Sequence, residues 1–150
     1  MANEKSPEMF AATDRLAMQS GDIIILIARV LIGWLFLTNG WMKLMNVAGT
    51  AGYLTNLGVP SPGFMVWIVL LCELVIGVTL ILGIAVRYAS LLTVVFVIVA
   101  TAIAHRYWQY PAAQQGAQYA NFCKNLAIVG GALLLFWTGG GRYSADAKIR

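Results

Sequence analysis

Residues 71–100, LCELVIGVTLILGIAVRYASLLTVVFVIVA, decide the fold, because two long apolar runs within them are separated only by residues 85–87. The runs belong to apolar spans over about 64–84 and 88–107. A helix needs about 20 apolar residues to cross the hydrocarbon core of a bilayer. A connection of three residues requires the two helices to be antiparallel neighbours. The stretch therefore predicts a transmembrane helical hairpin.

The composition of the whole chain agrees with a membrane protein. Of the 150 residues, 60% are hydrophobic and 11% are charged, whereas a soluble domain is about 25% charged. The mean hydropathy is +0.77, so the chain has more apolar surface than a core of this size can hide, and lipid must cover the rest. These numbers exclude a soluble globular domain, a disordered chain, a disulfide framework and a nucleic-acid-binding protein. The net charge of +4 reflects charge placement around a membrane.

Two further apolar spans, over about 23–42 and 122–137, bring the expected number of membrane helices to four. The predicted fold class is all-α: an integral membrane four-helix bundle with a short N-terminal interfacial helix. That helix, over 9–18, has apolar residues on one side and should lie on the membrane surface; a frayed polar tail is the alternative. The predicted organisation is a tail over 1–21, the bundle over 22–138 and a C-terminal tail over 139–150.

The orientation is predicted from the basic residues near the ends of the spans. One side holds six, namely Lys5, Arg15, Arg87, Arg142, Lys148 and Arg150, and the other holds three, namely Lys43, Arg106 and Lys124. The side richer in Lys and Arg faces the cytoplasm. We therefore expect a multi-pass protein of the bacterial inner membrane with both termini cytoplasmic. The long connections over 43–63 and 106–121, expected to be irregular and polar, then face the opposite compartment.

Residues that ligate metals or carry out dithiol chemistry are scarce. The chain has two cysteines, Cys72 and Cys123, and one histidine, His105. No C-x-x-C or C-x-x-C-H motif is present, and a zinc or bis-imidazole haem site needs more ligands than these. We predict no metal site and no covalently bound cofactor, and leave quinone or lipid as candidate ligands.

Arg29 and Glu73 are ionisable residues inside predicted spans. Each ion at the bilayer centre costs on the order of 2.5–3.5 kcal/mol on insertion scales, so an unpaired ion is expensive. Because the first two spans run in opposite directions, the two side chains are predicted to form an ion pair inside the bundle. The alternatives are a protonated Glu73 facing a quinone-sized cavity, snorkelling, and contact with another subunit.

A second polar cluster is expected at one membrane face, where the spans end. Its members are Asn39, Lys43, His105, Arg106, Lys124 and Asn125. Each cation alone is explained by anchoring to lipid headgroups. Together they would form a positively charged mouth above Glu73 that binds an anionic or quinonoid ligand or an acidic partner. His105 is a candidate proton donor to a reduced quinone.

The sequence resembles the DoxX-like family of small membrane proteins over about residues 23–147. The resemblance is carried by ARVLIGWLFLTNGWMKL (28–44), CELVIGVTLILGI (72–84), KNLAIVGGALLLF (124–136) and GGGRYSADA (139–147). The positions matching the family are Arg29, Lys43, Glu73, Lys124, Asn125, Arg142, Ser144 and Asp146. The resemblance implies four transmembrane helices. Relatives include the DoxD-type subunit of a thiosulfate:quinone oxidoreductase and MauE-type maturation proteins, which implies electron transfer and quinones.

Two functions follow as expectations. The first is a non-catalytic membrane subunit or assembly factor of a larger electron-transfer complex, respiratory, photosynthetic or other. The second is the quinone-reducing membrane subunit of an oxidoreductase such as the thiosulfate:quinone type; a transporter is a weaker third. The isolated chain is expected to have no turnover of its own. The expected partners are membrane lipids, a larger membrane complex and quinone, but no nucleic acid.

Overall fold

The computed structural model describes residues 5–149, and this part of the chain is all-α. Its helices are α1 (Lys5–Met45), α2 (Val47–Asn56), α3 (Pro62–Leu82), α4 (Val86–Ala104), the 3₁₀-helix η1 (Tyr107–Gln109), α5 (Ala112–Thr138) and α6 (Asp146–Ile149). Within these residues, four segments are long and apolar enough to cross a membrane: Phe10–Met45, Pro62–Leu82, Val86–Gln109 and Ala112–Thr138. The predicted all-α membrane helical bundle is confirmed. The side chain of Lys5 and the whole of Arg150, both used in the basic count, lie outside the described part.

The hairpin of α3 and α4 forms as its short connection predicts. Gly83 ends α3 with a φ of 73°, and Ala85 precedes α4 with a φ of 48°. The left-handed conformation costs an alanine roughly 1–2 kcal/mol. Asp146 offsets this cost, because its carboxylate accepts the N–H groups of Ala85 at 2.7 Å and Val86 at 2.9 Å. A residue near the C-terminus therefore caps the first turn of α4.

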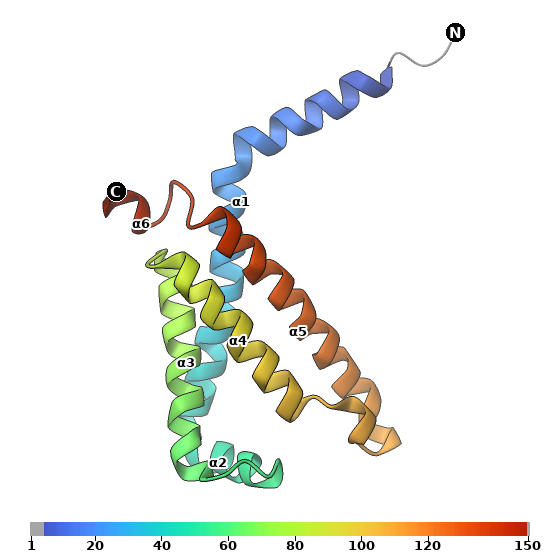
Figure 1. Cartoon of the computed structure of the whole chain (residues 1–150), viewed down its shortest axis with the longest axis vertical. Coiled ribbons are helices and arrows are strands. Elements are labelled where there is room, and N and C mark those ends of the chain that lie inside the picture. The colour runs from blue at the N-terminus through green and yellow to red at the C-terminus, as the bar shows by residue number, and fades with distance from the viewer. Residues whose placement is uncertain (1–4, 150) are drawn as a thin grey trace.

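The first helix differs from the prediction, because the expected interfacial helix over 9–18 is continuous with the first span. Helix α1 runs without interruption from Lys5 to Met45, and Figure 1 shows its early part leaving the bundle at an angle. The Ser20 hydroxyl donates to the Leu16 carbonyl, a bond of the i to i−4 kind that bends helices without ending them. A single glycine costs a helix interior only about 1 kcal/mol. The interfacial position of residues 9–18 remains a prediction.

The two long connections, expected to be irregular, are mostly helical. Helix α2 begins where the Asn46 side chain accepts the Gly49 N–H at 3.0 Å. Helix α5 begins at Ala112, ten residues before the predicted start at Phe122. The added stretch is rich in Ala and Gln, which favour helix without forming a continuous run of large apolar residues. In Figure 1, α2 lies across the end of the bundle opposite to α6, and we call these the α2 end and the α6 end.

Three glycines set the register between α1 and α3. A Cβ on Gly77 would lie 2.7 Å from the backbone N of Leu37, and one on Gly40 would lie 2.9 Å from the Leu74 side chain. A Cβ on Gly33 would lie 2.9 Å from the Gly77 carbonyl oxygen. Small residues let membrane helices approach closely where apolar burial gives little driving force. The antiparallel pair is therefore held in one register.

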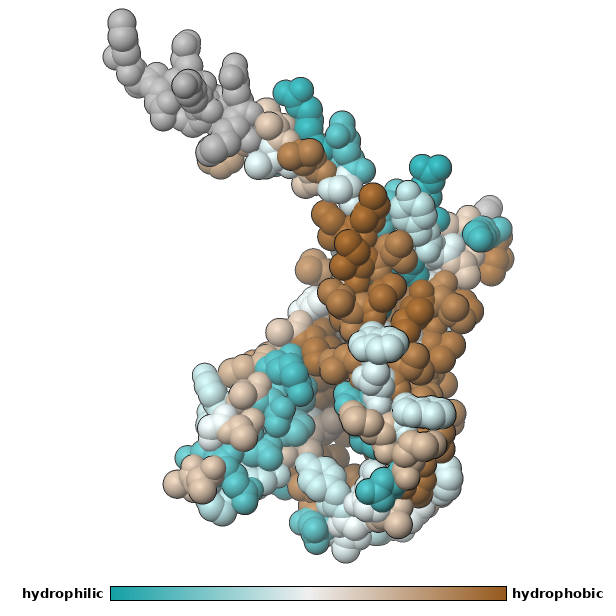
Figure 2. Space-filling model, turned by 180° about the vertical axis from the view of Figure 1, so that it is seen from behind, coloured by the Kyte–Doolittle hydropathy of each residue, from teal (hydrophilic) through white to brown (hydrophobic). Residues whose placement is uncertain are grey.

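The apolar side chains divide into a small core and a large outer surface. The core is formed by Phe36, Ile76, Leu80, Val86, Ala89, Val97 and Leu135. Many large apolar side chains remain exposed, among them Leu31, Leu71 and Leu134. Figure 2 shows a broad brown area of hydrophobic residues on one face of the bundle. An exposed apolar area of this extent is stable against lipid.

The C-terminal segment, expected to be a tail over 139–150, packs against the bundle. The Arg142 N–H donates to the Asp22 carboxylate at 2.9 Å. The Asp146 N–H donates to the Gly83 carbonyl at 3.0 Å, and Ser144 is buried. We call residues 139–147 the C-terminal clasp, because they join α1, α3 and α4 at the α6 end.

Candidate functional site

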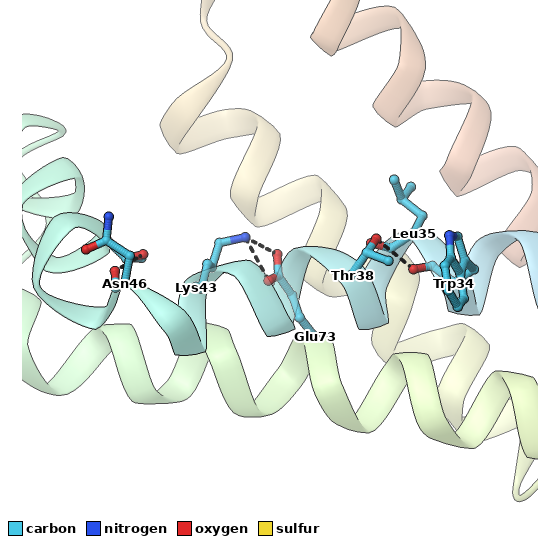
Figure 3. A network of polar contacts seen from close by, with 7 residues as sticks. Trp34, Leu35, Thr38, Lys43, Asn46 and Glu73 are labelled. Atoms are coloured by element: carbon cyan, nitrogen blue, oxygen red, sulfur yellow. Dashed lines mark hydrogen bonds and ion pairs between the residues drawn. The ribbon is translucent and has the colours of Figure 1, made fainter.

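Lys43 and Glu73 form an ion pair between α1 and α3. The Lys43 Nζ lies 2.7 and 2.8 Å from the two carboxylate oxygens of Glu73. Figure 3 shows the two side chains pointing toward one another from the facing helices. The Glu73 side chain is 8% exposed and that of Lys43 is 29% exposed. The carboxylate is thus buried, while the Lys43 side chain is partly exposed.

The predicted ion pair between Arg29 and Glu73 is wrong. Arg29 is fully buried, and its guanidinium donates to the carbonyl oxygens of Tyr143 at 2.8 Å and Leu80 at 3.3 Å. Within the described residues its Nε has no partner. Arg29 therefore holds the C-terminal clasp against α3, and it does not neutralise Glu73.

The register between α1 and α3 explains why the prediction failed. A Cβ on Gly40 would lie 3.3 Å from the Glu73 Cβ, whereas one on Gly83 would collide with the Arg29 guanidinium. Glu73 thus lies opposite the end of α1, and Arg29 lies opposite Gly83. Ten positions along α3 separate residues 73 and 83, which corresponds to about 15 Å along the axis. The antiparallel direction was predicted, but the offset between the helices was not.

A polar chamber adjoins the ion pair at the α2 end of the bundle. Its volume is about 200 Å³, and it is lined by Leu35, Phe36, Asn39, Lys43, Glu73, Phe96, Val97, Ala100, His105, Lys124, Asn125 and Ile128. Five of the six residues of the predicted cluster are among these, all except Arg106. The four helices α1, α3, α4 and α5 contribute to it, and Figure 2 shows the molecule hollowed near this end.

Hydrogen bonds hold several of these polar side chains in place. The His105 Nδ1 lies 2.8 Å from the Gln118 Oε1. The Asn125 amide donates to the Thr101 hydroxyl at 2.8 Å, and the Lys124 Nζ donates to the Asn121 side chain at 3.0 Å. The chamber is therefore built from oriented donors and acceptors and has two lysines against one carboxylate.

Arg106 is not part of this chamber, although the sequence grouped it with the others. Helix α4 ends at Ala104, and Arg106 instead lines a separate cavity of about 210 Å³ together with Asn56, Leu57 and Tyr110. Arg106 lies beyond the end of α4, so helical periodicity does not fix the direction of its side chain.

An apolar chamber lies on the other side of the ion pair. Its volume is about 350 Å³, and its lining consists of Lys43, Thr50, Tyr53, Leu54, Leu57, Val59, Met65, Ile68, Val69, Glu73, Phe96, Val99, Ala100, Ile103, Ala104 and His105. The residues from α2 and the following loop were not predicted, because that connection was expected to be irregular.

Burial raises the pKa of the Tyr53 phenol, and Tyr110 beside it adds to the increase. Lys43, Glu73 and His105 line both chambers.

These features define a class: small all-helical proteins that cross the membrane four times and hold a buried ion pair between two chambers. The chain belongs to the DoxX family, since the family model named DoxX matches residues 24–106. It is 38% identical over 128 residues to the inner membrane protein YqjF of Escherichia coli (strain K12), which covers 85% of this chain and 93% of the relative. It is 32% identical over 126 residues to the inner membrane protein YphA of the same organism, which covers 84% of this chain and 90% of the relative. No solved structure matches. Together with the four apolar helices, these relatives support a multi-pass inner membrane protein.

Proposed function

We propose that the protein is a non-catalytic membrane subunit that holds a quinone-class ligand for a larger electron-transfer complex. The observation that carries the proposal is the meeting of an apolar and a polar chamber at Lys43, Glu73 and His105. A ligand with a polar ring and an apolar tail has complementary surfaces for both chambers.

The apolar chamber suits the tail of such a ligand. Its volume of about 350 Å³ falls within the range typical of small-molecule sites, about 300–1,000 Å³. Leu54, Met65 and Ile68 line it, and no hydrogen-bonding requirement opposes a hydrocarbon chain beside them. Lys43, Glu73 and His105 form the polar end of this chamber, and the quinone ring would lie beside them.

The polar groups between the chambers suit the ring. A quinone carbonyl accepts hydrogen bonds, and Lys43 and Asn39 carry donors at the chamber wall. A reduced quinone carries hydroxyl donors, and the Glu73 carboxylate is an acceptor for them. Burying the polar groups of the quinone ring costs free energy unless they form hydrogen bonds of this kind.

The non-catalytic part of the proposal rests on composition. One histidine and two free cysteines offer few ligands for a redox centre, so we assign electron delivery to a partner. The polar surface at the α2 end, with Gln114, Gln115 and Gln118 of α5, is where we place the contact with that partner.

A quinone-reducing subunit is the second candidate, and the position of His105 favours it. The imidazole ring of His105 lines both chambers, and its Nδ1 is hydrogen-bonded to the Gln118 side chain. Reduction of a quinone by two electrons takes up two protons, and a histidine beside the ring is suited to deliver one of them. In this case the larger enzyme would reduce the quinone on this subunit.

The ligand part is tested by filling the chambers. Ala100 lines both chambers, whereas Ala102 on the same helix is exposed and lines neither. We expect Ala100→Phe to weaken binding of a short-chain ubiquinone about tenfold, by occupying its space, and Ala102→Phe to change it less than about twofold. Binding is measured on the purified full chain by quenching of tryptophan fluorescence. Equal affinities for the two variants would refute a ligand in these chambers.

The accessory part is tested in cells. Mild solubilisation followed by mass spectrometry should recover the chain with a larger redox complex. Deletion of the protein should lower assembly or quinone exchange of that complex without changing its cofactor spectrum. Quinone reduction by the isolated chain with a small donor at enzymatic rates would contradict the non-catalytic assignment.

A further inference from the structure

A separate polar cavity lies at the α6 end of the bundle. Its volume is about 360 Å³, and it is lined by Arg87, Thr138, Gly139, Gly140, Gly141, Ser144, Asp146 and Ala147. It shares no residue with the polar and apolar chambers. It lies where the C-terminal clasp meets the start of α4 and the end of α5.

Arg87 is held at this cavity with donors to spare. Its Nη1 donates to the Phe136 carbonyl at 2.8 Å, which fixes the guanidinium at the end of α5. A Cβ on Gly139 would lie 3.5 Å from both Nε and Nη2, so this edge of the guanidinium passes over a residue without a side chain. Among the described residues no carboxylate forms an ion pair with Arg87. Its charge is therefore available to a ligand.

The glycine-rich segment of the clasp, residues 139–141, supplies further donors. Gly139 and Gly141 have φ values of 76° and 68°, a conformation in which side chains are strained. The N–H groups of Gly140 and Gly141 donate to no acceptor in the described part of the chain. Backbone N–H groups in short glycine-rich turns commonly bind oxyanions.

Asp146 is the acidic member of the lining, and its charge is already engaged. Both of its carboxylate oxygens accept backbone N–H groups at the first turn of α4, at 2.7 and 2.9 Å. The positive end of the α4 dipole adds to this compensation. The uncompensated charge of the cavity is thus that of Arg87, which favours an anion over a cation.

Two aromatic residues indicate the depth of the cavity. Tyr88 follows Arg87 and is 80% exposed, and Trp137 precedes Thr138 and is 78% exposed. Exposed Tyr and Trp at the ends of membrane helices lie at the level of the lipid headgroups. The cavity therefore opens where phosphate groups are concentrated.

We propose that this cavity binds a phosphate group, with Arg87 and the N–H groups of the clasp as its donors. The phosphate belongs either to the headgroup of an anionic phospholipid or to a free phosphate ion. Arginine is the side chain best suited to it, because its planar fork can bind two phosphate oxygens at once.

The test compares two arginines of the same region. Arg87→Gln removes the proposed ligand, whereas Arg142→Gln removes the same charge from a residue of the clasp that does not line the cavity. The full chain in non-ionic detergent is titrated with phosphatidylglycerol, with phosphatidylcholine and with inorganic phosphate. Binding is read by native mass spectrometry and by the melting temperature.

We expect the wild type to prefer phosphatidylglycerol to phosphatidylcholine. The dissociation constant should rise about tenfold in Arg87→Gln, by a smaller factor in Arg87→Lys, and less than about twofold in Arg142→Gln. Stabilisation by inorganic phosphate at millimolar concentration would identify free phosphate as the source, and its absence would identify the lipid. If Arg87→Gln does not fold, Ala147→Phe fills the cavity without removing the charge and should abolish the preference. Equal losses of affinity in Arg87→Gln and Arg142→Gln would overturn the proposal. So would a wild type that neither prefers phosphatidylglycerol to phosphatidylcholine nor binds inorganic phosphate.

Discussion

Replacing Lys43 and Glu73 singly and together measures how strongly the ion pair holds α1 to α3. Lys43→Met leaves the Glu73 carboxylate, which is 8% exposed, without its partner. Removing one member of a buried pair costs about 3–5 kcal/mol of unfolding free energy. Glu73→Gln leaves the ammonium of Lys43, which is 29% exposed and borders the polar chamber. Because this cation is less buried than the carboxylate, we expect a smaller loss, of about 1–2 kcal/mol.

The double variant removes both charges and leaves no ion to be solvated. It should therefore be less destabilised than the sum of the two single losses, with a coupling energy of about 1–3 kcal/mol. The measurement is reversible unfolding of the full chain in mixed micelles with increasing dodecyl sulfate, followed by circular dichroism.

The matched control is the cycle of Arg29→Met with Glu73→Gln. Since Arg29 donates to Leu80 and Tyr143, these two changes should add to within about 0.5 kcal/mol. Additive losses in the Lys43 and Glu73 cycle, or coupling above about 1 kcal/mol in the Arg29 and Glu73 cycle, would refute the register derived above.

Three further outcomes are expected. In a cysteine-free background, single cysteines at Gln115 and Ala147 should differ in intact cells, with only position 115 reacting with an impermeant thiol reagent; labelling at 147 would reverse the predicted orientation. Gly77→Ala should lower the unfolding free energy by about 2 kcal/mol because its methyl group collides with the α1 backbone, whereas Gly130→Ala, which meets no atom within 4 Å, should be neutral or stabilising. Asp146→Asn should cost about 1 kcal/mol, since it weakens the cap of α4, and an unchanged melting temperature would count against the cap.

The helices could be predicted because the signals for them are local. A run of about 20 apolar residues has few stable alternatives to a membrane helix, and the three residues between α3 and α4 allow only an antiparallel hairpin. The prediction failed for helical segments that are too polar or too short to cross a membrane. Residues 112–121 of α5 and all of α2 are of this kind, because a search for long apolar runs does not detect them.

The site was only half predictable, because its partners depend on the offset between helices. Arg29 and Glu73 were recognised individually as costly, but the pairing with Lys43 follows from the contacts of Gly40 and Gly77 with the neighbouring helix. The spacing of Gly33 and Gly40, seven residues apart on one face of α1, is the signal that could have indicated the register. The role of the C-terminal clasp rests on contacts between residues 60 to 120 positions apart, which no local pattern reveals.

The bond between Arg29 and Tyr143 has a consequence for the order in which the protein is made. The two residues are 114 positions apart, so at roughly 5–20 residues per second Tyr143 leaves the ribosome roughly 6–23 seconds after Arg29. During that interval the first helix carries a guanidinium whose final acceptor has not been synthesised. Insertion of α1 must then be completed with the cation near the bilayer surface or beside water, and its burial becomes the last step of biogenesis. A chain truncated before the clasp would lack the Tyr143 acceptor, so the buried guanidinium would keep only the Leu80 carbonyl as its partner.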